Sequence, residues 1–156
     1  IIHALDWLKI NREEPKTIAH IRPTTPLRSV SLMDKAIKLF LSDKKATALR
    51  SVHEMPVSAY KTFEISKDGK LNCICSNDFN LDSSNNSRQN FPKTYSGNGY
   101  IDLLSTKFIR DNGLLHGDNV IPFVTPFTID VDSEEDFEYL EFIVKSRKNL
   151  SERLFL

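Results

Sequence analysis

The sequence predicts an α/β fold, in which helices cover a layered β-sheet. Short apolar segments suited to buried strands alternate along the chain with segments whose apolar residues repeat at helical spacing. With 156 residues the chain has the length of one domain, and its 40% hydrophobic and 27% charged residues are typical of a globular protein. We therefore expect a single α/β domain over residues 1–156.

Four segments have the features of helices, and they cover residues 2–10, 31 to about 41, 105–112 and 133 onward. Ser31 is the expected N-cap of the second helix. The expected buried stripe of that helix consists of Leu32, Ala36, Ile37 and Phe40. Gly113 ends the third helix, and Ser133 with Asp136 forms a capping box at the start of the fourth.

The expected strands cover residues 17–21, 46–52, 100–104, 120–124 and 127–131. Residues 62–75 predict a β-hairpin, because Asp68-Gly69 supplies the backbone conformation of a tight turn. Residues 76–97 are rich in Asn, Ser and Asp and indicate a long loop. We expect residues 60–97 to be an insertion that the sheet itself does not need.

The composition excludes several classes of partner. Lys plus Arg equals Asp plus Glu, at 21 each, so no overall basic field favours nucleic acid. No apolar run approaches the roughly 20 residues that span a bilayer, so we expect no membrane segment. Cys73 and Cys75 are too close in sequence for a good disulfide, which favours the cytoplasm. The chain begins at Ile1 without methionine, and we expect it to be the remainder of a longer protein.

Asp130 and Asp132 alternate with apolar residues just before the last helix. On an extended strand both carboxylates would project from one face. Adjacent carboxylates repel unless a cation or a proton lies between them, and Mg²⁺ with substrate phosphates suits such a pair. The alternative is a solvated strand end before a helix cap.

A proline-rich loop, Pro23-Thr24-Thr25-Pro26, lies between an expected strand and an expected helix. Ligands of open α/β sheets bind outside the carboxyl ends of strands. Arg22 and Arg28 flank the loop and would clamp an anion through their planar guanidinium groups. The alternative is a rigid turn with two surface arginines.

Two later segments, 88–92 and 97–99, frame a second candidate site. Gly97 and Gly99 permit close approach of the backbone to a ligand, and Asn98 offers donors and acceptors to a polyhydroxylated substrate. The third glycine of a dinucleotide fingerprint is missing. An ordinary glycine turn remains the alternative, and Lys61 at the hairpin start would by itself be a solvated lysine.

Taken in order, these segments resemble the acylneuraminate cytidylyltransferases, or CMP-sialic acid synthetases, and their relatives that act on other nonulosonic acids. The matching segments are Ile2–Leu5, Arg22–Arg28, Tyr60–Thr62, Arg88–Pro92 with Asn98-Gly99, and Thr128–Asp132 followed by Glu135-Asp136. The resemblance implies a Rossmann-like nucleotidyltransferase sheet flanked by helices. It also implies an inserted β-hairpin that dimerises two copies of the chain.

This resemblance implies transfer of a cytidylyl group from CTP to a nonulosonic acid, with release of pyrophosphate. Asp130 and Asp132 would be the catalytic residues that hold Mg²⁺. The implied substrate-binding residues are Arg22, Thr24, Lys61, Arg88, Gln89, Asn98, Gly99 and Asp102. Of these, Lys61 and Arg88 resemble residues that reach into the neighbouring subunit's site and meet the carboxylate of the sugar.

The sequence departs from the family at three points. The glycine-, serine- and lysine-containing loop that binds CTP is not found in these residues, so we expect the chain alone to be inactive. Arg22 stands where sialic acid synthetases usually have glutamine, and Asp102 where many have tyrosine. A legionaminate- or pseudaminate-type sugar therefore becomes plausible. The alternatives are a non-catalytic dimerising relative and a nucleotidyltransferase that acts on a neutral sugar phosphate.

Overall fold

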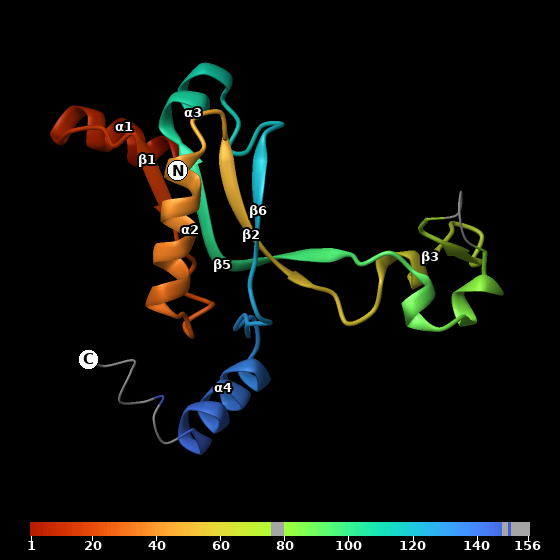
Figure 1. The fold of residues 1–156 in the computed structure, drawn as a ribbon. Coiled ribbons are helices and arrows are strands. Elements are labelled where there is room, and N and C mark those ends of the chain that lie inside the picture. Colours follow the sequence, from red (N-terminus) through yellow and green to blue (C-terminus); the bar gives the residue numbers. More distant parts are fainter. Residues whose placement is uncertain (76–79, 148–149, 151–156) are drawn as a thin grey trace. The chain divides into compact units, whose positions relative to one another are not determined.

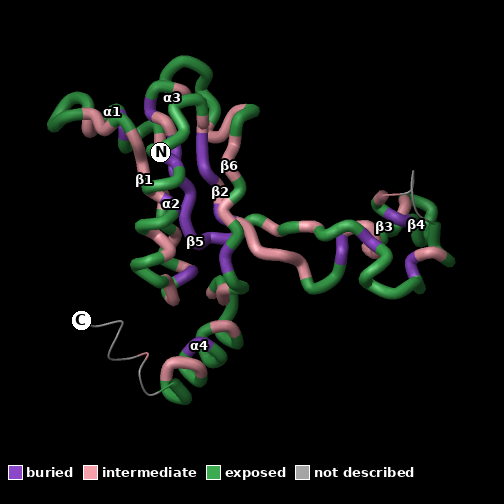
Figure 2. Tube along the Cα trace, viewed as in Figure 1, coloured by how far each residue is buried: buried purple, intermediate pink, exposed green. Residues whose placement is uncertain are grey.

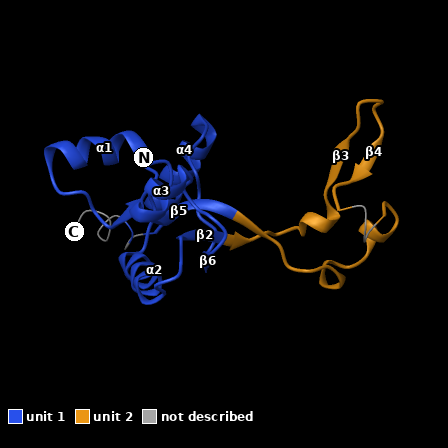
Figure 3. Ribbon diagram, turned by 90° about the horizontal axis from the view of Figure 1, so that it is seen from above, with its two compact units in different colours: residues 1–52, 97–156 blue, residues 53–96 orange. Residues whose placement is uncertain are grey.

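A computed structural model of the protein describes residues 1–75, 80–147 and 150. The chain forms two compact units (Figure 3). Unit 1 contains residues 1–52 and 97–156, and unit 2 contains residues 53–96. Within the described ranges, none of the helices combines the length and the apolar character needed to span a bilayer.

The main sheet has the strand order β1-β5-β2-β6 (Figure 1). Its strands are β1 (Thr17–His20), β2 (Ala48–Glu54), β5 (Tyr95–Ser105) and β6 (Val120–Val124). β5 runs antiparallel to β1, with Asp102 opposite His20, whereas β6 runs parallel to β2, with Pro122 opposite Arg50. The sheet is therefore mixed. The strands expected at 17–21, 46–52, 100–104 and 120–124 are all present, with bounds shifted by up to five residues.

Successive strand residues point to opposite faces of the sheet, so apolar residues lie on both faces. Helices cover both of these faces. One face packs on α2 (Val30–Ser42), and its buried cluster consists of Ala36, Phe40, Leu49, Tyr100, Ile101 and Leu103. The other cluster joins α1 (Ile2–Asn11) and α3 (Thr106–Asn112) to the sheet through Leu5, Ala48, Leu104 and Ile109. Figure 2 shows the buried backbone concentrated along β5 and β2. These layers confirm the predicted α/β class.

The helix ends follow the predicted caps with one exception. Ser133 and Asp136 form the expected capping box of α4 (Glu134–Ser146), and Gly113 ends α3 in the left-handed conformation with φ of 67°. The prediction of Ser31 as the cap of α2 is wrong. Ser29 is the N-cap, because its backbone is extended and its N–H donates to the hydroxyl of Tyr100.

The predicted strand at 127–131 is also wrong, because these residues belong to none of the strands. Pro126 has no N–H to offer a sheet ladder. The backbone bonds of this connection run elsewhere: Thr125 donates to the carbonyl of Val52, and Val131 donates to the carbonyl of Thr24. The connection between β6 and α4 therefore lies alongside the proline-rich loop.

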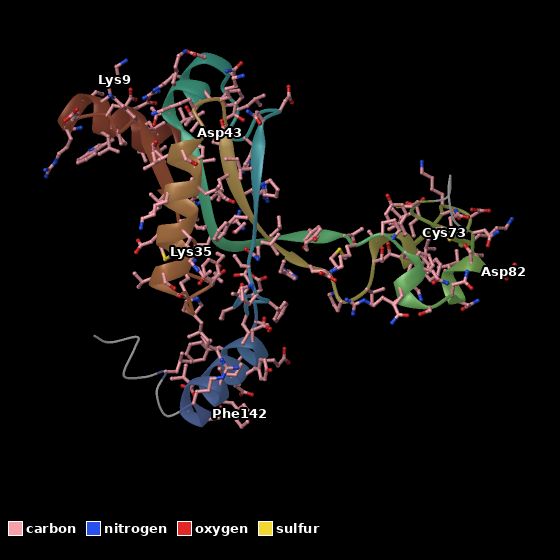
Figure 4. The ribbon with its side chains drawn as sticks, viewed as in Figure 1. Lys9, Lys35, Asp43, Cys73, Asp82 and Phe142 are labelled. Carbon is pink, nitrogen blue, oxygen red and sulfur yellow. The ribbon has the colours of Figure 1, made fainter. Side chains whose placement is uncertain are left out.

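Unit 2 contains the predicted hairpin, formed by β3 (Phe63–Ile65) and β4 (Leu71–Cys73) in antiparallel pairing. Gly69 has φ of 76° in its turn, which explains the preference for glycine there. Three short 3₁₀ helices cover 59–61, 83–85 and 88–90. The loop expected over 76–97 is shorter, since β5 begins at Tyr95, and its residues 76–79 lie outside the described residues. Cys73 is a buried free thiol in this unit (Figure 4).

Candidate functional site

The proline-rich loop connects β1 to α2 in unit 1. A turn brings the N–H of Thr25 to the carbonyl of Arg22 at 3.3 Å, and Thr25 is fully buried. Its hydroxyl donates to Oδ1 of Asp130 at 3.3 Å. The neighbouring carbonyl of Thr24 accepts the N–H of Val131 at 2.8 Å. The proline-rich loop, called the threonine loop below, therefore lies beside the acidic segment around Asp130. The two segments are more than a hundred residues apart in sequence.

Asp130 and Asp132 are both exposed and lie in irregular backbone before α4. The N–H of Asp132 donates to the carboxylate of Asp136 at 3.2 Å, so the capping box also anchors this segment. Hydrogen bonding to Ser133 lowers the pKa of Asp136 and keeps this anchor ionised. The side chain of Asp132 makes no hydrogen bond or ion pair with any described residue.

Within the described residues, no group of three or more His, Cys, Asp or Glu side chains is arranged to hold a metal ion. Mg²⁺ does not need such a group, since one or two carboxylates with substrate phosphates and water complete its shell. The carboxylate of Asp130 and the hydroxyl of Thr25 bonded to it offer oxygen atoms, the ligand type that Mg²⁺ prefers. The residues present therefore fit this ion.

The start of β5 packs directly on the threonine loop. A Cβ atom at Gly99 would lie 2.3 Å from Oγ1 of Thr25, so only glycine fits here. Asn98 is buried, donates to the hydroxyl of Thr125 at 2.9 Å and accepts the N–H of Tyr100 at 3.2 Å. Both polar atoms of its side chain thus bind protein groups. A substrate contact from Asn98 stays a prediction.

Arg22 and Asp102 form a pair at the carboxyl end of β1. Their charged groups lie 3.6 Å apart, and Asp102 is only 4% exposed. Oδ1 of Asp102 is buried and has no hydrogen-bond partner among the described residues. A buried carboxylate oxygen normally has a donor, so this atom is available to a donor group that approaches the pair.

Arg28, which the sequence predicts to clamp an anion, binds carbonyl oxygens of its own chain. Its Nε donates to the carbonyl of Tyr100 at 2.7 Å, and its Nη2 donates to the carbonyls of Gly99 and Arg22. Burial lowers the pKa of Arg28, while the neighbouring Tyr100 and Asp130 act in the opposite direction. Arg28 therefore ties the loop to β5 through Nε and Nη2, and a contact with an anion stays a prediction.

Arg88 and Gln89 line a cavity of about 550 Å³ in unit 2. Arg88 and Lys93 both form ion pairs with Glu54, at 3.3 Å and 2.8 Å. The hydrogen bond from Lys93 lowers the pKa of Glu54. Arg88, Lys93 and Glu54 together carry two positive charges and one negative charge. The net positive charge of this cluster favours an anionic ligand.

Lys61 lies in the same unit. Its Nζ donates to the carbonyl of Asn86 at 2.7 Å and lies 5.2 Å from the centre of the Phe91 ring. Phe91 also lines the cavity of Arg88. Lys61 is therefore held in place by protein contacts, unlike the freely solvated lysine that its isolated position in the sequence suggests.

A second cavity, of about 670 Å³, lies in unit 1 between the first turn of α2 and α4. Its lining includes Arg28, Tyr100 and Tyr139. None of the substrate-binding or metal-binding residues that the sequence predicts lines this cavity.

The sequence of the chain is similar to that of a protein named for flagellin modification. It is 29% identical over 141 residues to "post-translational flagellin modification protein B" of Campylobacter coli. The match covers 89% of this chain and 57% of that protein, so the chain spans a little over half the length of this relative. No model of a known protein family matches the chain.

The structure adds contacts that position the predicted site residues. Thr25 fixes Asp130, Asp136 anchors Asp132, and Glu54 with Lys93 positions Arg88. Of these contacts, only the capping box has a local sequence signal. The others join residues that are distant in the chain, which a single sequence does not reveal.

Proposed function

We propose that the complete protein is a cytidylyltransferase that activates a nonulosonic acid with CTP and releases pyrophosphate. The observation that carries this proposal is the contact of the threonine loop with Asp130, which unites the predicted sugar-binding and metal-binding segments. Similarity to a protein named for the post-translational modification of flagellin supports a sugar-activating nucleotidyltransferase. The resemblance to CMP-sialic acid synthetases supports CTP as the nucleotide and a Rossmann-like sheet as the scaffold.

Transfer of a nucleotidyl group depends on charge neutralisation at the phosphates and on placement of the attacking oxygen. In the proposal, Asp130 and Asp132 hold Mg²⁺, which neutralises charge on the triphosphate when it is bound. The hydroxyl of Thr25 fixes Oδ1 of Asp130. Helix α4 fixes the backbone of Asp132 through Asp136. The chain thus fixes the carboxylate of Asp130 and the backbone of Asp132.

We propose that unit 1 contributes Arg22, Thr24, Asn98, Gly99 and Asp102 to recognition of the sugar. Lys61, Arg88 and Gln89 of unit 2 would bind the sugar in the site of the neighbouring subunit, as the resemblance implies for Lys61 and Arg88. A charge-assisted contact between Arg88 and the sugar's carboxylate would contribute roughly 1.5–3 kcal/mol, which favours acidic over neutral sugars.

We further propose that the protein is a cytoplasmic homodimer that uses the hairpin of unit 2. Ile65 and Leu71 lie opposite each other on β3 and β4, and they are 76% and 48% exposed. An exposed apolar pair on a two-stranded hairpin is more stable when a second surface covers it. This observation supports the dimer over a solvated hairpin.

The test uses the complete protein, in which the relevant variant is Asp132→Asn. Pyrophosphate release is measured with CTP against a panel of nonulosonic acids. We expect wild-type activity with at least one acid and a loss of about a hundredfold or more in the variant, because removal of one electrostatic stabiliser typically costs that much. Glu138→Asn is the control, since Glu138 is an exposed carboxylate of α4 outside the site.

Wild-type turnover in Asp132→Asn, with an unchanged unfolding midpoint, would remove the metal assignment. A wild-type protein that releases no pyrophosphate with any acid would defeat the proposed activity. That result would favour a non-catalytic dimerising relative, or a nucleotidyltransferase for a neutral sugar phosphate.

A further inference from the structure

Arg50 lies on β2 with its side chain over the start of β5. A Cβ atom at Gly97 would lie 3.2 Å from both Nε and Nη2 of Arg50. Any side chain at position 97 would therefore press on the guanidinium group. Gly97 is exposed and Arg50 is half-buried, so the guanidinium lies at the edge of the folded core beside open backbone.

The charge of Arg50 has no acidic counterpart. Within residues 1–75, 80–147 and 150, no carboxylate forms an ion pair with it. Its recorded polar contact is with Nε2 of His116, to which Nη1 donates at 3.5 Å. By contrast, Arg110 pairs with Asp6 and Glu14. The described carboxylates therefore leave the charge of the half-buried Arg50 unneutralised.

Arg22, the other arginine that lies over a glycine of β5, differs from Arg50 because it pairs with a buried carboxylate. Asp102 lies on β5, the strand that also carries Gly97, and its Oδ1 is buried without a hydrogen-bond partner. Its Oδ2 pairs with Arg22, whose Cδ lies 3.4 Å from the place of a Cβ at Gly99. The two glycines of this strand therefore each leave room for an arginine. Of the two arginines, only Arg22 has an acidic partner.

We propose that Arg50 binds an oxyanion of the substrate beside Gly97. The planar guanidinium group matches carboxylate and phosphate oxygens in a two-point contact, and the missing side chain at Gly97 leaves the space that the guanidinium itself occupies. This inference rests on the proposed function, which supplies two oxyanions: the carboxylate of the sugar acid and the phosphates of CTP. Arg50 is thus a substrate-binding residue in addition to those predicted from the sequence.

The experiment compares Arg50→Gln and Arg50→Lys with wild type in the complete protein. Arg12→Gln is the control, because Arg12 is an exposed arginine with no recorded side-chain contact. KM is measured separately for CTP and for the accepted sugar acid, together with kcat. We expect Arg50→Gln to raise one KM by roughly tenfold or more, and Arg50→Lys to recover part of the loss. A rise in KM for the sugar acid assigns the carboxylate, and a rise in KM for CTP assigns the phosphates.

Unchanged KM values for both substrates in Arg50→Gln would overturn the proposal. Gly97→Ala is a second test, since it displaces the guanidinium while the charge remains, and it should raise the same KM. Calorimetric titration with inorganic pyrophosphate and with N-acetylneuraminate separates this proposal from the activity itself. If wild type binds either compound without turnover and Arg50→Gln binds it tenfold more weakly, the oxyanion site stands and the proposed reaction fails. Equal binding of both compounds by the two proteins rejects the oxyanion site.

Discussion

Arg28→Ala should destabilise unit 1 by an amount that its hydrogen bonds determine. One side chain joins three carbonyl oxygens, those of Tyr100, Gly99 and Arg22. These carbonyls belong to two segments, the start of the threonine loop and the first half of β5. Truncation to alanine therefore removes the link between the loop and the sheet, and it leaves the carbonyl of the buried Tyr100 without this donor.

The magnitude follows from the charge of the donor. A hydrogen bond to a charged group contributes about 1.5–3 kcal/mol net, twice the value of a neutral one. The three bonds of one side chain act as a unit and do not add, and Arg28 is only half-buried. We therefore expect a loss of about 2–4 kcal/mol in the free energy of unfolding. For a chain of this size, that loss corresponds to a fall of about 5–15 °C in Tm.

The assay is urea unfolding followed by circular dichroism, with Arg28→Lys and Arg12→Ala alongside. Arg28→Lys should lose less than Arg28→Ala, because one ammonium replaces part of the donor set. Arg12→Ala should lie within about 0.5 kcal/mol of wild type, as exposed substitutions usually do. If Arg28→Ala and Arg12→Ala unfold at the same urea concentration, Arg28 does not hold the loop and the reasoning is refuted.

Two further predictions concern α4 and the hairpin. Ser133→Ala should lower the free energy of unfolding by about 1 kcal/mol at pH 7, through loss of the capping box. The pKa of Asp136 is lowered in the fold, so its stabilising effect is present above the unfolded pKa and is lost as pH falls through the folded value. The fall in the unfolding midpoint from pH 7 to pH 3 should therefore be smaller in Ser133→Ala than in wild type. A fall of the same size in both proteins would contradict this prediction. Ile65→Glu should convert the dimer to a monomer in analytical ultracentrifugation, whereas Glu64→Gln on the same strand should leave it intact; a dimeric Ile65→Glu protein would exclude the hairpin as the interface.

The sequence predicted most of the fold because most of its signals are local. Alternation of apolar residues located four strands, and the Asp68-Gly69 turn located the hairpin. Gly113 and Ser133 marked helix ends through backbone conformation and side-chain capping. The strand expected at 127–131 failed because an apolar alternation also suits an extended connection whose hydrogen bonds run to a distant loop.

The site was less predictable, because its decisive contacts join residues far apart in the chain. Nothing near Arg28 in the sequence indicates that its donors bind carbonyls of β5. In the same way, nothing in the sequence distinguishes Arg50 from other arginines. The structure shows that its guanidinium lies over Gly97 and that no described carboxylate pairs with it. The sequence predicted which segments would carry the site. It did not identify which of their charges the protein itself neutralises.

The contact between Thr25 and Asp130 links the stability of the loop to the position of the proposed metal ligands. Thr25 is buried under Gly99, so its hydroxyl has little freedom to turn away from Asp130. Arg28 holds the same glycine through its carbonyl oxygen. A change at Arg28 should therefore reach Asp130 through Gly99 and Thr25, although Arg28 donates to none of the predicted metal ligands. On this reasoning, Arg28→Ala would lower kcat of the complete protein even at temperatures where it remains folded.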